Sequence, residues 1–143
     1  MDIFESSSYS DTEIIARNFA EKLNPGDIVR LQGEMGVGKT VFVRGIASYF
    51  EAENDVCSPT FAIMNIYPGT TPIYHFDLYR LESEEDIYDA GLYEFMAKGD
   101  GISVVEWPDL LREYPKAVIY DITITKNLDI SENYRKITME ESL

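Results

Sequence analysis

The sequence predicts an α/β fold with one layered domain. Segments typical of strands alternate along the chain with segments typical of helices, and short turns join some of the strands. The chain has 143 residues, which is enough for one domain with a sizeable core. We therefore expect a single domain over residues 1–143. Its sheet should be mixed and mostly parallel, with antiparallel hairpin strands, and helices should flank it.

The first third of the chain predicts a helix, a strand and a second helix. Ser10 and Glu13 have the spacing of a helix capping box, and a periodic apolar face follows them. A turn signal at residues 24–26 ends this first helix. Residues 28–32 then form an apolar run typical of a strand, and residues 41–50 carry apolar side chains at helical spacing.

The rest of the chain predicts further strands around one more helical region. Residues 60–67 and 73–79 resemble strands on either side of a turn-rich segment, which favours a β-hairpin or a meander. Ser83 can cap a helix that continues to about Met96. The later elements are a buried strand at 102–105, a helical turn within 108–114, and two strands at 117–125 and 134–139.

The segment between the first predicted strand and its helix is a nucleotide-binding motif. Residues 33–40 read Gly-Glu-Met-Gly-Val-Gly-Lys-Thr, the G-x-x-x-x-G-K-T pattern of the phosphate-binding loop, or P-loop. The glycines let backbone N–H groups face phosphate oxygens, Lys39 reaches the β- and γ-phosphates, and the Thr40 hydroxyl is a ligand for Mg²⁺. A strand–loop–helix context also points a helix N-terminus at the anion. The alternative, a flexible glycine-rich turn, requires the Lys-Thr pair and both flanks to be accidents.

Two carboxylates are candidates for metal binding and catalysis. Asp77 lies near the end of a predicted strand and could hold Mg²⁺ directly or through water, or it could simply cap a turn. Glu106 directly follows the buried strand at 102–105, at the edge where open α/β sheets bind ligands, so it could ligate Mg²⁺ or orient water. His75, the only histidine, is more often a satisfied hydrogen-bonding group than a catalytic one. The expected catalytic residues are Lys39, Asp77 and Glu106, and the expected metal ligands are Thr40, Asp77 and Glu106.

The composition argues against some classes of function, namely direct nucleic-acid binding and membrane association. The net charge is −14, from 26 acidic and 12 basic residues, which argues against non-specific binding of nucleic acid by this chain alone. No apolar run is long enough to span a bilayer and no signal peptide is recognisable, so we expect no membrane association. Cys57 is the only cysteine, which favours a reducing, cytoplasmic location.

Four sequence blocks, taken together, resemble the TsaE (YjeE) family of small bacterial ATPases required for threonylcarbamoyl-adenosine formation in tRNA. The blocks are G-E-M-G-V-G-K-T at 33–40, S-P-T-F at 58–61, H-F-D-L-Y-R at 75–80 and V-E-W-P at 105–108. The resemblance implies a compact P-loop fold, binding of ATP with Mg²⁺, and slow ATP hydrolysis. It also implies docking on the TsaD–TsaB pair, with tRNA reached only through that complex.

The resemblance also implies roles for individual residues. The family's metal-associated residues fall on Thr40 and Glu106, its motif aspartate on Asp77, and its switch-like residues on Ser58 and Thr60. Val41 stands where many relatives have a second threonine. Base contacts in the family come from the first helix and the C-terminal strands, which here hold Tyr9, Ser10, Thr12, Tyr134 and Arg135. The expected nucleotide-binding set is Tyr9, Gly33, Glu34, Met35, Gly36, Val37, Gly38, Lys39, Thr40, Val41 and Arg135.

Two other functions use the same loop. A small-molecule kinase would need a second substrate pocket and a mobile lid, often rich in arginine, and this short chain offers few arginines for one. A nucleotide-gated interaction module with negligible turnover would share the loop and the acidic residues.

Overall fold

Twelve elements make up the part of the protein that the computed structural model describes, residues 1–52, 64–79 and 81–142. The strands are β1 (Asp2–Ser6), β2 (Ile28–Gln32), β3 (Met64–Tyr67), β4 (Ile73–Asp77), β5 (Ile102–Glu106), β6 (Ile119–Lys126) and β7 (Arg135–Ser142). The helices are α1 (Tyr9–Ala20), α2 (Lys39–Tyr49), α3 (Glu84–Asp89) and α4 (Leu92–Lys98), with a 3₁₀ turn, η2 (Pro108–Leu110).

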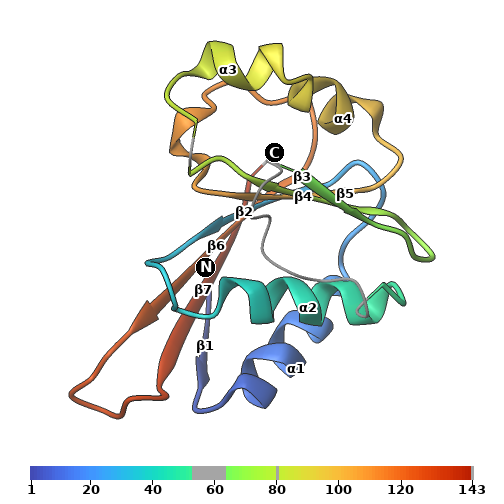
Figure 1. Ribbon diagram of the computed structural model, residues 1–143. Coiled ribbons are helices and arrows are strands. Elements are labelled where there is room, and N and C mark those ends of the chain that lie inside the picture. The colour runs from blue at the N-terminus through green and yellow to red at the C-terminus, as the bar shows by residue number, and fades with distance from the viewer. Residues whose placement is uncertain (53–63, 80, 143) are drawn as a thin grey trace.

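The strands form one seven-stranded sheet in the order β1-β7-β6-β2-β5-β4-β3. The central strands β6, β2, β5 and β4 pair in parallel, while β3, β7 and β1 add to the two sides by antiparallel pairing. Helices α1 and α2 lie against one face of the sheet and α3 and α4 lie over the other (Figure 1). The structure thus confirms the predicted α/β fold with a mixed sheet flanked by helices.

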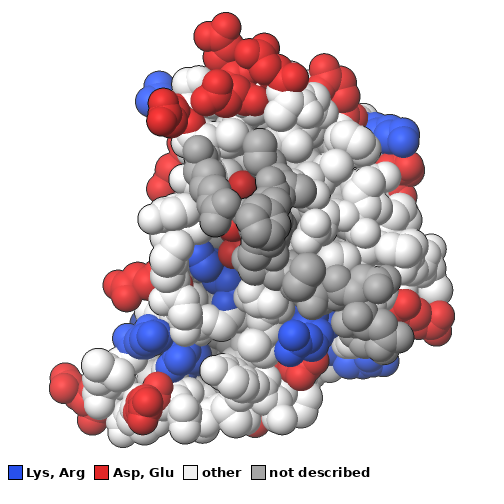
Figure 2. Space-filling model, in the orientation of Figure 1, with Lys and Arg blue, Asp and Glu red and all other residues white. Residues whose placement is uncertain are grey.

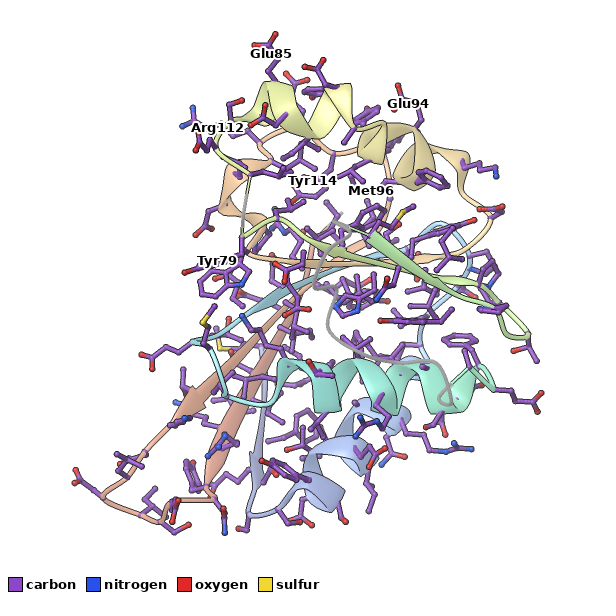
Figure 3. All side chains as sticks on the ribbon, in the orientation of Figure 1. Tyr79, Glu85, Glu94, Met96, Arg112 and Tyr114 are labelled. Atoms are coloured by element: carbon purple, nitrogen blue, oxygen red, sulfur yellow. The ribbon has the colours of Figure 1, made fainter. Side chains whose placement is uncertain are left out.

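The central strands bury side chains on both faces. Val29 and Leu31 of β2 join the core under α1 and α2, whereas Ile28 joins a second core under α3 and α4. Figure 3 shows Met96 and Tyr114 between the α3–α4 layer and the sheet, while Glu85 and Glu94 point away from it. Within the described part of the chain, no helix is both long and apolar enough to cross a membrane.

The start of the first helix differs from the prediction. Ser8, not Ser10, is the N-cap: its hydroxyl accepts the N–H of Asp11 at 3.1 Å, and the Asp11 carboxylate accepts the N–H of Ser7 at 3.0 Å. Two serine–acid pairs have the same spacing, Ser8 with Asp11 and Ser10 with Glu13. The earlier one is used because α1 begins directly after β1, where the buried hydroxyls of Ser6 and Thr12 are 2.7 Å apart.

Two further features lay outside the sequence prediction. Strand β1 was not predicted, since only Ser6 of its five residues is buried and it shows no alternating apolar face. The helical region from Ser83 divides into α3 and α4 because Gly91 adopts a left-handed φ of 76° between them.

The hairpin prediction is confirmed over β3 and β4. Its first residues, 60–63, lie outside the described residues, as do Cys57, Ser58, Thr60 and Arg80.

Helices α1 and α2 approach each other closely at Gly45, and this contact can be tested. A Cβ at this position would lie 2.5 Å from the carbonyl oxygen of Glu13 and 2.6 Å from the Cβ of Ala16. Gly45→Ala should therefore lower the free energy of unfolding by about 1–3 kcal/mol, although alanine is otherwise the better helix former by about 1 kcal/mol. Urea unfolding measures the change, with Arg44→Ala on the exposed side of α2 as control. A more stable Gly45→Ala protein would contradict the close contact.

Candidate nucleotide site

The loop between β2 and α2 has a backbone that only its glycines can adopt. Gly38 has a φ of 111°, in the left-handed region, and serves as the N-cap of α2 without a side-chain cap. A Cβ on Gly33 would lie 2.7 Å from Cγ1 of Val37 and 2.8 Å from the carbonyl oxygen of Ile124. The uncapped start of α2 leaves backbone N–H groups available, which is how P-loops bind phosphate.

A hollow of about 250 Å³, the loop pocket, lies at the carboxyl ends of the central strands. Parallel register places Glu106 of β5 between Leu31 of β2 and Asp77 of β4, so both carboxylates lie next to the loop that follows β2. The structure therefore brings together most of the predicted site residues. The lining consists of Tyr9, Met35, Gly36, Gly38, Lys39, Thr40, Val41, Asp77, Glu106 and Trp107.

Lys39 is buried at this pocket and already has partners. Its Nζ lies 3.9 Å from Oε1 of Glu106 and 3.8 Å from the centre of the Trp107 ring. Burial lowers the pKa of Lys39, while the negative charges of Glu106 and Asp77 act in the opposite direction. The cation is thus held close to where phosphates would bind.

Trp107 has an unusual backbone conformation and lines the loop pocket. Its φ of 56° lies in the left-handed region, which is unusual for a bulky residue and is found at functional sites. The ring lies against Tyr79 as well as Lys39, with 5.0 Å between the centres of the two aromatic rings. The side chain therefore forms part of the wall of the loop pocket.

Glu106 is almost fully buried and is held by more than one partner. Its Oε2 makes a short hydrogen bond with Nε2 of His75, and its Oε1 faces Lys39. His75 is itself completely buried, with Nδ1 2.8 Å from the hydroxyl of Tyr67. The sequence prediction did not include Tyr67; its only signal was a place on the same face of the predicted hairpin as His75.

Asp77 has one of the two roles that the sequence left open, that of capping a turn, and it also lies at the loop pocket. Its Oδ1 accepts the backbone N–H of Tyr79 at 3.1 Å, so the side chain does cap the turn after β4. The same half-buried side chain also lines the loop pocket. Burial raises the pKa of the Asp77 carboxyl and the charge of Glu106 adds to this, against the opposing effects of the Tyr79 N–H, His75 and Lys39.

This raised pKa predicts that Asp77 makes the free protein less stable at neutral pH. A native carboxyl with a raised pKa holds its proton more tightly than the unfolded chain, so stability falls as pH rises from the unfolded pKa, about 3.9, through the folded one. Asp77→Asn should therefore raise the thermal midpoint at pH 7, and the difference should shrink below about pH 4. Calorimetry at pH 7 and pH 3 measures this. A lower midpoint for Asp77→Asn at pH 7 would contradict the expectation.

A second hollow of about 280 Å³, the Arg135 pocket, adjoins the first. The two share Tyr9 and Gly38, so they follow the same loop. Among the predicted base-contacting residues, Tyr9, Thr12 and Arg135 line this pocket, whereas Ser10 lines a separate hollow and Tyr134 is buried. The remaining loop residues Gly33 and Glu34 line a further hollow beside β6.

Arg135 fastens the loop to the C-terminal hairpin. Its guanidinium donates to the carbonyl oxygens of Val37 at 2.7 Å, Tyr134 at 2.7 Å and Glu132 at 3.0 Å. These bonds cross-link a loop carbonyl to the start of β7. Arg135 therefore stabilises the shape of the loop, and its guanidinium also borders the Arg135 pocket.

Loss of this fastening should weaken nucleotide binding. We expect Arg135→Ala to raise the Kd for ATP about tenfold, which is a loss of about 1.4 kcal/mol of binding free energy. The reason is that part of the binding free energy must then order the loop, which Arg135 holds in place in the free protein. The matched control is Lys136→Ala, which removes the same charge from the adjacent exposed position. Titration calorimetry compares the two variants; equal losses would mean that charge rather than the loop contact is responsible.

The residues of the loop pocket fit a magnesium ion that is held together with phosphates. Among the described residues, no group of three or more His, Cys, Asp or Glu side chains could hold a metal ion by itself. Mg²⁺ commonly uses one or two carboxylates, waters and substrate phosphates, so Thr40, Asp77 and Glu106 are the right donors in number and type.

Comparison with known proteins identifies the family. The family model for "Threonylcarbamoyl adenosine biosynthesis protein TsaE" matches residues 6–137. The chain belongs to the TsaE family. The predicted family resemblance is thereby confirmed, and membership places this protein among those of tRNA threonylcarbamoyladenosine biosynthesis.

Individual TsaE relatives match most of the chain. The TsaE protein of Rickettsia bellii is 39% identical over 137 residues, covering 94% of this chain and 92% of the relative. The TsaE protein of Bacillus subtilis is 41% identical over 104 residues, covering 72% of this chain and 64% of the relative. Both are called tRNA threonylcarbamoyladenosine biosynthesis proteins. The crystal structure of Bacillus subtilis YdiB superposes with a TM-score of 0.75 at 29% identity, covering 96% of this chain and 83% of that one.

Proposed function

We propose that this TsaE family member is a Mg²⁺-dependent ATPase that supports formation of threonylcarbamoyladenosine in tRNA by the TsaD–TsaB pair. One observation carries the proposal. Lys39 and Thr40, at the start of α2, share a single pocket with the carboxylates of Asp77 and Glu106. A binding loop alone needs only the first two residues, and the two carboxylates are what hydrolysis adds.

The loop pocket would take the phosphates. Backbone N–H groups at the start of α2 would bind the phosphate oxygens. Lys39 would give up its contacts with Glu106 and Trp107 and bind the β- and γ-phosphates instead. This exchange keeps the lysine charge paired before and after binding, which favours a preformed site. The adjoining Arg135 pocket would take the base, with the exposed ring of Tyr9 at the boundary of the two pockets.

The carboxylates would serve the hydrolytic step. Thr40 and Asp77 would hold the metal, which when bound spreads the charge of the β- and γ-phosphates. Glu106 has one oxygen fixed by His75 and the other turned toward Lys39, so it would orient the attacking water from a constant position. The hydrolysed bond is the one between the β- and γ-phosphates, and the products are ADP and phosphate.

The charge distribution supports a partner that holds the tRNA. Figure 2 shows acidic side chains gathered over the α3 end of the molecule, where Glu84, Glu85 and Asp86 form the first turn of that helix. With a net charge of −14, the chain is poorly suited to bind a polyanion by itself. The TsaD–TsaB pair would therefore bind the tRNA and this chain would supply the ATPase.

The test is release of ADP by the chain alone, and then with the TsaD–TsaB pair, each with Mg²⁺ and with excess EDTA. We expect slow hydrolysis alone, faster hydrolysis with the pair, and none with EDTA. No release of ADP under any condition would support a nucleotide-gated module instead. Transfer of the phosphoryl group to an added small molecule would support a kinase.

A further inference from the structure

Behind Glu106, on the side away from Lys39, lies a row of hydrogen-bonding side chains, of which the hydrolysis proposed above uses only the bond from His75. It consists of Asn65 and Tyr67 of β3 and His75 of β4. The strand registers put these residues on the same face as Asp77 and Glu106, because Asn65 pairs with His75 and Asp77 pairs with Glu106. We propose that His75 is a positioning residue that fixes the Glu106 carboxylate toward the loop; this inference rests on the proposed function.

The donors of two of these hydrogen bonds follow from the chemistry of the groups. The amide nitrogen of Asn65 lies 3.4 Å from the hydroxyl oxygen of Tyr67 and can only donate to it. The Tyr67 hydroxyl oxygen also lies 2.8 Å from Nδ1 of His75. A carboxylate oxygen can only accept a hydrogen bond, so the proton between the ring and Oε2 of Glu106 is on Nε2 of His75. The contact with Glu106 thus requires a proton on Nε2 of His75.

The geometry at Glu106 shows what this donor accomplishes. A glutamate side chain has several rotatable bonds, and here Lys39 is available as a competing partner at 3.9 Å from Oε1. The bond from His75 holds Oε2 on the opposite side, so the carboxylate cannot rotate to place both oxygens on the lysine. One oxygen remains directed into the loop pocket, and Lys39 remains available to phosphate.

The alternative is that His75 only fills space in the core. Complete burial is compatible with that reading, since the described buried side-chain nitrogen and oxygen atoms all have partners. A space-filling role predicts that any variant of similar size loses activity only as it loses stability. A positioning role predicts that the donor at Nε2 matters separately from volume.

Substitutions separate these two readings. His75→Gln places an amide N–H near the position of Nε2, whereas His75→Leu has no donor. We expect His75→Leu to lower the rate constant of hydrolysis about 10- to 100-fold while the Kd for ATP changes less than about threefold. His75→Gln should recover the rate to within about fivefold of wild type. The control is Phe76→Leu, the adjacent buried residue on the opposite face of β4, which should lose stability and keep its rate constant.

A spectroscopic measurement tests the same claim without ATP. Because His75 is the only histidine, the ¹⁵N NMR signals of its ring are unambiguous. We expect a slowly exchanging proton on Nε2 and a shift of this proton in Glu106→Gln. An Nε2 without a proton, or a ring that averages between tautomers, would overturn the proposal. So would equal losses of rate in the leucine and glutamine variants. If the wild-type protein hydrolyses no ATP, the proposed function fails and the NMR result alone decides the role of His75.

Discussion

Lys39→Ala should remove most of the affinity for ATP. A charge-assisted contact of this kind contributes about 1.5–3 kcal/mol, which corresponds to a Kd raised by about 10- to 150-fold. The loss should not be larger, because Lys39 gives up contacts with Glu106 and Trp107 when it binds phosphate. Titration calorimetry with ATP and Mg²⁺ measures the change directly.

The control for this substitution is Lys98→Ala. Lys98 is exposed and lies 3.8 Å from Asp100, so its removal changes the net charge equally without touching either pocket. Its Kd for ATP should match that of the wild type. Affinity at the wild-type level in Lys39→Ala would exclude the loop as the phosphate site.

Glu106→Gln should separate binding from hydrolysis. The amide keeps the shape of the side chain and can still accept the bond from His75, but it carries no charge to orient water or to bind a metal. We expect hydrolysis to fall about 100-fold or more, the range seen when a positioned acid or base is lost. The Kd for ATP should change much less, because the loop and Lys39 remain.

Two comparisons make the Glu106 result specific. Asp109→Asn makes the equivalent change at an exposed carboxylate three residues further on, and it should hydrolyse ATP normally. Asp77→Asn tests the other carboxylate of the pocket. Normal hydrolysis by Glu106→Gln together with complete loss in Asp77→Asn would mean that the two carboxylates have the opposite roles.

The part of the site that could be predicted from sequence is the part built from local pattern. The motif at 33–40 implies a particular backbone conformation for the loop. The predicted bounds of the flanking strand and helix agree with those of β2 and α2 to within two residues. Glu106 and Asp77 were found because each ends a strand, and the ends of parallel strands meet at one edge.

The parts that could not be predicted depend on pairing between distant segments. His75 and Glu106 are 31 residues apart, and only the parallel register of β4 and β5 brings them into contact. The helix cap at Ser8 rather than Ser10 was decided by a contact between Ser6 and Thr12, at the junction of β1 with α1. β1 itself lacks buried apolar residues, and its pairing with β7 is what makes it a strand.

The most direct test of the central claim is sustained formation of threonylcarbamoyladenosine in a reconstituted reaction. The mixture contains threonine, bicarbonate, ATP, Mg²⁺, tRNA and the purified synthesis proteins, including TsaD and TsaB, with this chain present or omitted. We expect modified adenosine to accumulate over many turnovers with the wild-type chain. Synthesis should stop early when the chain is omitted or replaced by Glu106→Gln. Sustained modification at the same rate without the chain would contradict the account.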